Sequence, residues 1–231
     1  MADRDSTTRQ RLLAVACGLL AEKGYRQATV TEICRRADAN IAAVSYHFGG
    51  KEKLYVAAWE HAHRQMLEAH PPDGGVPAEA PPAQRLEGRI RALVRRALDE
   101  RDVAFRIGEH EMANPTGLLR QVVRAAIAPL RRDTAAVIAE LLGPGAYERT
   151  VRLCSLSVIA PIRGLMHRRR MRRHLGGKRR LIEDSEGGLV EHFTAFAFAG
   201  IDRIRRRLGR ADGRRSKRLN RRQTSAARKE K

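Results

Sequence analysis

The chain has 231 residues and a formal net charge of +20, with 46 Lys or Arg against 26 Asp or Glu. This excess of positive charge points to polyanionic partners, nucleic acid first and an anionic membrane surface second. Only 4% of the residues are aromatic and few segments alternate between apolar and polar side chains, which predicts an all-α fold, and no apolar run is long enough to span a membrane or resembles a signal peptide.

The first predicted helix begins after six polar residues that should fray. Thr7 and Gln10 match the capping-box pattern at its start, and Gly24 suits the left-handed residue that often ends a helix. An apolar stripe at helical spacing runs between them: Leu12, Leu13, Ala16, Leu19 and Leu20. We expect this helix to pack behind the segment that follows and to hold it rigid.

A short second helix is predicted directly after it. Thr29 and Glu32 form another capping box, so the helix should begin at Val30. Its apolar positions recur at helical spacing and should face inward: Val30, Ile33 and Ala37.

A tight turn and a third helix come next, which completes a helix-turn-helix. Asp38-Ala39 makes the turn, and Asn40 is a suitable N-cap for a helix from Ile41 to Phe48. Val44 should face inward with the last residue of this helix. The outward residues are small, aromatic and imidazole side chains, which suit contacts with phosphates and base edges in a DNA groove: Ala43, Ser45, Tyr46 and His47.

The run NIAAVSYHFGGKEKLY, which starts at Asn40, resembles the recognition helix and the following helix of the TetR family of transcriptional regulators. The likeness rests on the cap residue, on Tyr46-His47-Phe48 and on Lys51-Glu52. Asp38 stands where the family commonly has Gly, and Asp adopts a left-handed conformation more readily than most residues. The resemblance implies that these residues bind DNA: Thr29, Thr31, Ala43, Ser45, Tyr46, His47 and Lys51.

Residues 51–208 are expected to form a larger helical domain. A helix should run from Lys51 to about His70, and a mobile loop should follow, because five prolines interrupt the twelve residues from Pro71 to Pro82. Apolar spacing predicts further helices from near Ala83, over Val103–Ala113, over Thr116–Leu142, around residues 151–165 and over Glu186–Leu208.

The last two predicted helices are rich in apolar and small residues. The TetR resemblance places a dimer interface in this region, as a four-helix bundle made by two copies of the chain. A buried core within one chain would produce the same apolar stripes. The paired half-sites that helix-turn-helix proteins read favour the homodimer.

The stretch from Arg106 to Leu130 is similar to the C-terminal domain of CecR-like members of the family, and Asn40–Val44 in the recognition helix favours the same subgroup. The resemblance implies that this domain binds a small, largely apolar effector. Polar residues of this stretch are predicted to orient that ligand: Arg106, His110 and Asn114. Helix kinks at Pro129 and Pro161 should leave the space that it needs.

No catalytic or metal-binding constellation is predicted. Glu109-His110-Glu111 lacks both the H-E-x-x-H spacing and a second cluster of ligands elsewhere in the chain. Cys17, Cys34 and Cys154 have no C-x-x-C spacing and are expected to be buried thiols in a reducing cytoplasm. With no nucleophile beside a base and no phosphate-binding loop, we expect neither an enzyme nor a cofactor.

Two basic segments lie near the C-terminus. The run Arg168–Arg180 is typical of a solvated surface, although phosphate contacts would use the same residues. From Arg203 to Lys231 the chain has 14 Lys or Arg against two Asp or Glu, and its apolar pattern stops at Leu208, so residues 209–231 are predicted to be a disordered tail. Such a tail either adds salt-sensitive attraction to DNA or only keeps the protein soluble.

These patterns predict three parts: a DNA-binding domain at residues 1–50, an effector-binding and dimerisation domain at 51–208, and the basic tail at 209–231. The predicted function is that of a TetR-like regulator, a homodimeric repressor that a small-molecule effector releases from a palindromic DNA operator. The alternative is an architectural DNA-binding protein of weak sequence specificity that relies on its basic tail. No membrane partner is expected.

Overall fold

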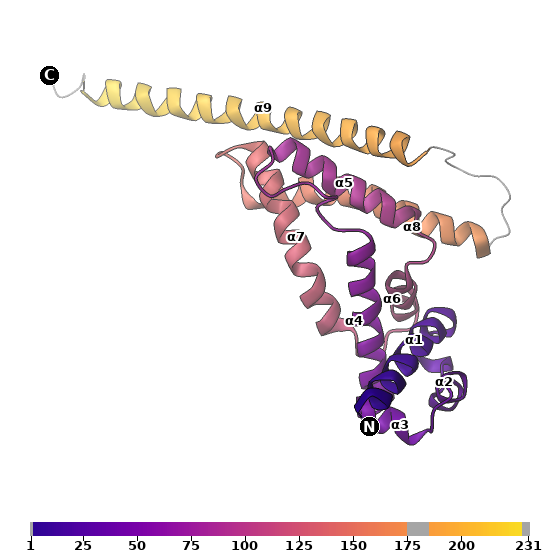
Figure 1. The fold of residues 1–231 in the computed structure, drawn as a ribbon. Helices are drawn as coiled ribbons and strands as arrows, with labels where there is room; N and C mark the ends of the chain where they lie inside the picture. The colour runs from indigo at the N-terminus through magenta and orange to yellow at the C-terminus, as the bar shows by residue number, and fades with distance from the viewer. Residues whose placement is uncertain (1, 175–184, 228–231) are drawn as a thin grey trace. The chain divides into compact units, whose positions relative to one another are not determined.

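The computed structural model describes the backbone of residues 2–174 and 185–227, and the side chains of residues 6–167 and 185–210. All regular secondary structure in these ranges is α-helical, as the composition predicted (Figure 1). The helices are α1 (Ala2–Gln27), α2 (Val30–Arg36), α3 (Ala42–Phe48), α4 (Lys51–Ala69), α5 (Pro82–Leu98), α6 (Val103–Ala113), α7 (Arg120–Leu142), α8 (Glu148–His174) and α9 (Glu186–Ala227).

The helices lie close to where the sequence placed them, with a few displaced ends. α1 begins at Ala2, ahead of the predicted capping box, and Gly24 interrupts it with a φ of 74°. α7 begins at Arg120 rather than Thr116, because the carboxylate of Glu111 accepts the backbone N–H groups of Thr116 and Gly117 at 3.0 and 2.9 Å and holds them in a loop.

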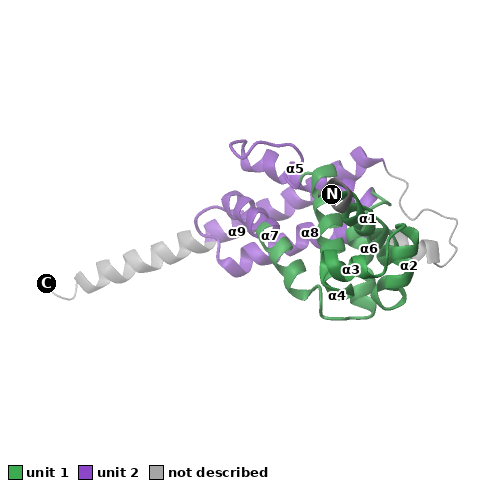
Figure 2. Cartoon of the chain, turned by 60° about the horizontal axis from the view of Figure 1, so that its bottom comes forward, with its two compact units in different colours: residues 1–71, 99–129 green, residues 72–98, 130–231 purple. Residues whose placement is uncertain are grey.

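The chain divides into two compact units, coloured in Figure 2: unit 1 contains residues 1–71 and 99–129, and unit 2 contains residues 72–98 and 130–231. This division differs from the predicted boundary at residue 50. α4, α6 and the start of α7 share one buried core with α1, in which Leu12, Tyr55, Ile107 and Leu119 are almost fully enclosed.

Unit 2 is built around α5, which packs against α8 and α9. Residues of four helices are buried in it: Leu86, Ile90 and Val94 of α5, Val137 and Ile138 of α7, Val158 and Ile162 of α8, and Val190 and Ile201 of α9. Arg85 of α5 also forms an ion pair with Glu140 of α7. The core thus draws on segments that are far apart in the sequence.

The proline-rich segment after α4 packs directly on α5 instead of standing free as a mobile loop. A Cβ atom on Gly74 would overlap the backbone carbonyl of Gly88, and a Cβ atom on Gly88 would overlap the carbonyl oxygen of Asp73. The two backbones can approach this closely only because both positions are glycine. This contact fixes the loop on the first turns of α5.

α9 continues to Ala227, beyond Leu208, where the apolar pattern ends. The sequence predicted disorder from residue 209, whereas the backbone is helical over most of that segment. Arg, Lys, Gln and Ala, which dominate it, all have favourable helix propensity. The basic run Arg168–Arg180 lies outside the residues whose side chains are described.

Among the described helices, none combines the length and the apolar character that a membrane span requires.

Candidate functional site

The first helix of the helix-turn-helix starts as the sequence predicted. The side chain of Thr29 accepts a hydrogen bond from the backbone N–H of Glu32 at 3.2 Å, and α2 begins at Val30. The carboxylate of Glu32 forms two ion pairs, one with Lys23 of α1 and one with Arg36, each at 2.8 Å. The hydrogen bond from Lys23 lowers the pKa of Glu32, and the pair ties α2 to α1.

The turn and the start of α3 follow from two short polar side chains. Asp38 adopts a left-handed conformation, with a φ of 48°. Asn40 Oδ1 accepts the backbone N–H of Ala42 at 2.9 Å, so α3 begins at Ala42, one residue later than predicted. Val44 and Phe48 are buried, as their spacing indicated, and they seat α3 on the core of unit 1.

The solvent side of α3 carries a compact polar and aromatic surface. Tyr46 is 74% exposed and its ring lies 4.9 Å from the ring of half-buried His47. Ser45 is also exposed, and Ala43 is partly covered. The structure therefore brings these four predicted residues together on one helix, while Thr29 and Thr31 are exposed at the start of α2.

Two residues near this surface were not predicted. Ile41 is 56% exposed just before α3, and a large apolar side chain at the N-terminal end of a recognition helix is the sequence signal that could have found it. Tyr25 lies under the predicted phosphate ligand Lys51, whose Nζ is 4.4 Å from the centre of the Tyr25 ring. Burial lowers the pKa of Lys51.

The three predicted effector residues lie on α6 or just after it, within unit 1. His110 and Asn114 border a cavity of about 100 Å³, whose other lining residues are Lys23, Gly24, Tyr25, Arg26, Gln27 and Tyr55. Arg106 is not part of that lining. The cavity is much smaller than the roughly 300–1,000 Å³ of a typical small-molecule pocket.

Glu111, the third member of the Glu109-His110-Glu111 run, connects α4 to the loop before α7 by hydrogen bonds. Its carboxylate accepts the buried hydroxyl of Tyr55 at 3.0 Å as well as the two backbone groups before α7. Burial and the charge of Glu111 raise the pKa of Tyr55, so its hydroxyl stays protonated. Within the described residues, no group of three or more His, Cys, Asp or Glu side chains has an arrangement that could hold a metal ion.

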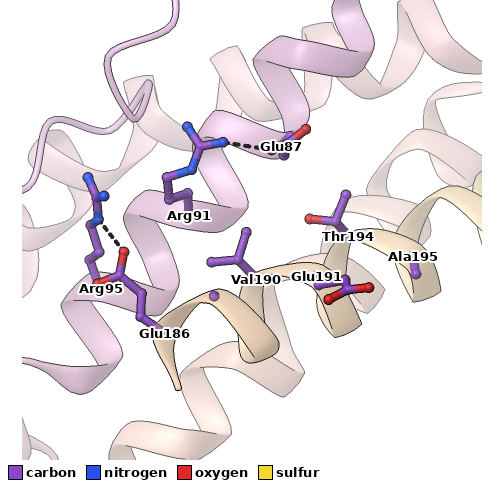
Figure 3. Close-up of a pocket in the computed structure, with 9 residues that line it drawn as sticks. Glu87, Arg91, Arg95, Glu186, Val190, Glu191, Thr194 and Ala195 are labelled. Atoms are coloured by element: carbon purple, nitrogen blue, oxygen red, sulfur yellow. Dashed lines mark hydrogen bonds and ion pairs between the residues drawn. The ribbon is translucent and has the colours of Figure 1, made fainter. Parts of the chain in front are cut away.

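A larger groove of about 500 Å³ lies in unit 2 between α5 and the start of α9 (Figure 3). Both arginines of its lining are already paired: Arg91 with Glu87 and Arg95 with Glu186, each at 2.6 Å. Val190 and the buried hydroxyl of Thr194 also line the groove.

Comparison with known proteins agrees with these features. Residues 12–58 match the family described as "Bacterial regulatory proteins, tetR family", and residues 82–201, just over half of the chain, match "HTH-type transcriptional dual regulator CecR, C-terminal domain". The CecR regulator of Shigella flexneri is 28% identical over 178 residues, which are 70% of this chain and 77% of that protein.

Two solved structures share the fold. A transcriptional regulator from Pseudomonas aeruginosa PAO1 has a TM-score of 0.67 at 17% identity, covering 87% of this chain and 93% of its own. The regulator AibR, solved with isovaleryl coenzyme A and operator DNA, has a TM-score of 0.62 at 16% identity, covering 83% and 98%. With a helix-turn-helix whose aromatic face is open to solvent and a C-terminal region of the CecR type, the chain belongs to the TetR family of transcriptional regulators.

Proposed function

We propose that this regulator is a homodimeric repressor that acts in the cytoplasm, binds a palindromic operator and is released from it by a small-molecule effector. The observation that carries the DNA-binding part is the outer surface of α3, where Tyr46 is largely exposed although Val44 and Phe48 of the same helix are seated on the core. Tyrosine and histidine side chains on the outer side of a helix-turn-helix can reach the phosphates and base edges of a major groove.

Exposed apolar side chains on the last two helices support the homodimer. Leu153 and Leu156 of α8 are 49% and 62% exposed, and Phe196 of α9 is 66% exposed. Other residues of the same helices already fill the core of unit 2, so these three side chains present apolar surface that the core does not use. A second copy of the chain would bury it, and the two recognition helices would then read two half-sites.

Two observations support release by an effector. The chain shares the C-terminal domain type of CecR, and the AibR structure of the same fold holds both an acyl coenzyme A and operator DNA. An effector releases DNA only if it binds the DNA-free state more tightly, and a hundredfold preference corresponds to roughly 2.7 kcal/mol.

Selection from a pool of random DNA duplexes tests the DNA-binding part. We expect enrichment of one two-fold symmetric sequence, bound as a dimer in preference to bulk DNA. Repeating the titration with one half-site scrambled is the control, and affinity should fall steeply. A protein that binds every duplex equally would be the architectural DNA-binding protein instead.

A ligand screen tests the release. Compounds that raise the melting temperature of the protein are titrated against the complex with the selected operator. We expect at least one of them to weaken operator binding, while a compound without a thermal shift should leave it unchanged. Stabilising ligands that never alter operator affinity would contradict effector release.

A further inference from the structure

The outer surface of the recognition helix changes character along its length. Its N-terminal end presents three apolar side chains in succession, Ile41, Ala42 and Ala43, of which the first two are exposed and the third is partly covered. Hydroxyl and imidazole groups follow only from Ser45 onward. The three residues at the N-terminal end therefore offer a DNA groove apolar contact and no side-chain hydrogen bond.

Ile41 is the large member of this apolar end, and neither packing nor capping accounts for it. Its side chain is 56% exposed. In the part of the chain that the structure describes, it lies outside the buried core of unit 1, which Val44 and Phe48 join from the same helix. It does not cap α3 either, because Asn40 Oδ1 accepts the backbone N–H of Ala42 at 2.9 Å. An isoleucine at this position is thus explained by a contact outside the chain.

The neighbouring polar side chain, that of Asn40, already has a structural task. An asparagine reads an adenine by pairing its amide with N6 and N7 of the base. The cap bond to Ala42 holds the amide of Asn40 against the backbone at the start of α3. Pairing with a base would have to compete with this bond, which the helix end needs. Apolar contact is therefore the form of base readout that this end of α3 favours.

Apolar contact in a major groove selects one base. In a helix-turn-helix, the N-terminal residues of the recognition helix meet the base edges of the major groove. Thymine presents a methyl group at that edge, whereas adenine, guanine and cytosine present hydrogen-bonding groups there. An isoleucine side chain removes water from the methyl group favourably, but it would leave the polar groups of the other bases without a partner.

We propose that Ile41 is a specificity-determining residue that packs against the methyl group of a thymine in each operator half-site. This inference rests on the proposed function, because it requires a specific operator. Ser45 lies four residues after Ile41 and on the same side of α3, so its hydroxyl would meet the bases next to that thymine. The short side chains of Ala42 and Ala43 let this end of the helix approach the base edges closely.

Replacing thymine by deoxyuridine tests the contact, because it removes the methyl group and keeps the hydrogen-bonding groups of the base. The selected operator is synthesised with deoxyuridine at one thymine position at a time, in both half-sites together. Each duplex is titrated with the full-length protein by fluorescence anisotropy. We expect one position at which affinity falls roughly tenfold to twentyfold, about fourfold for each half-site, as the burial of one methyl group predicts.

Substitutions connect this loss to the residue. The side chain of Ile41→Ala is too short to reach the methyl group, so this variant should bind the thymine operator more weakly by at least the same factor. Deoxyuridine at that position should then cause no further loss. Ile41→Val keeps the branched shape and should stay sensitive to deoxyuridine. Both variants should keep the melting temperature of the protein within a few degrees, because the side chain is exposed.

Met112→Ala is the matched control, because Met112 is a large apolar residue that is 61% exposed on α6, outside the helix-turn-helix. It should leave both the operator affinity and the deoxyuridine effect unchanged. Half-sites without thymine, deoxyuridine tolerated at every position, or an undiminished deoxyuridine effect in Ile41→Ala would each refute the contact while the operator itself stands. A pool of duplexes from which no symmetric sequence is enriched would overturn the proposed function and this inference with it.

Discussion

Beside the recognition helix, the ring of Tyr25 lies 4.4 Å beneath the ammonium group of Lys51 and restricts where that charge can go. A cation over an aromatic ring is stabilised by about 0.5–1 kcal/mol at an exposed site. Tyr25 therefore holds Lys51 at the first turn of α4, where a DNA phosphate would meet it. We regard Tyr25 as a positioning residue for this contact.

We predict that Tyr25→Leu weakens operator binding by roughly twofold to fivefold, because Lys51 loses its support, while Tyr25→Phe keeps the ring and the affinity. Fluorescence anisotropy with the selected operator measures both. In a Lys51→Ala background the leucine substitution should have no further effect. An undiminished effect there would mean that Tyr25 acts independently of Lys51.

The neighbouring Tyr46 and His47 on the outer side of α3 lead to a second prediction. Tyr46→Ala and His47→Ala should each cost on the order of 1–3 kcal/mol per half-site if they remove base contacts, and the loss should depend on the operator sequence. Lys51→Ala should weaken binding to all sequences alike, as the loss of a phosphate contact does. Gln65→Ala, exposed on α4, is the control. Unchanged operator binding by the triple variant of Tyr46, His47 and Lys51 would contradict the predicted interface.

At the level of helices, α8 and α9 both contribute to the core of unit 2 and also expose large apolar side chains, Leu153 and Leu156 on α8 and Phe196 on α9. We predict that Leu156→Glu combined with Phe196→Glu gives a monomer in sedimentation velocity and reduces operator affinity, because a charge buried in the interface is strongly unfavourable. The helical signal in circular dichroism should persist, since neither residue is in the core of unit 2.

Tyr147→Glu provides the comparison, because Tyr147 is equally exposed but lies before the start of α8. This variant should remain dimeric. If the double variant also sedimented as a dimer, the interface would have to lie elsewhere on the chain.

Local interactions were the part that the sequence could predict. The cap at Thr29, the left-handed Asp38 and the inward-facing Val44 all depend on residues within one helical turn, and the structure has all three. Periodicity indicates which side of a helix is buried but not which helix covers it. For this reason α6 could be placed in the sequence, while its packing on α1 in unit 1 could not.

The residues of the candidate sites also differ in whether a local sequence pattern could predict them. The residues of α3 that are predicted to face DNA lie within five positions of one another, so a local pattern was enough to propose them. Tyr25 meets Lys51 across 26 positions of sequence, so this contact depends on tertiary packing. Arg106 was predicted together with His110 and Asn114 as a polar residue of one stretch, and the cavity at His110 does not include it.

For the molecule as a whole, the net charge of +20 is concentrated toward the C-terminus. We predict that removing residues 210–231 leaves the remaining helices folded and the dimer intact, because the apolar pattern ends before them. Affinity for random DNA should fall and its dependence on salt should flatten, since fewer counterions are released on binding. Titrations at several salt concentrations measure both quantities.

Specific operator affinity, measured at one fixed salt concentration, serves as the internal reference for that truncation and should fall less than affinity for random DNA. A truncated protein that lost its helical signal or became a monomer would show that the segment is structural.

The loop crosses α5 in close backbone contact at Gly74 and Gly88, and this contact has a consequence for how related sequences can diverge. Glycine inside a helix costs about 1 kcal/mol relative to alanine, so position 88 keeps a residue that is unfavourable for α5 as long as the loop passes over it. A homologue in which this loop is shortened or redirected is released from that constraint. Loop length and the residue at position 88 are therefore expected to evolve together, with alanine appearing at position 88 where the crossing is lost.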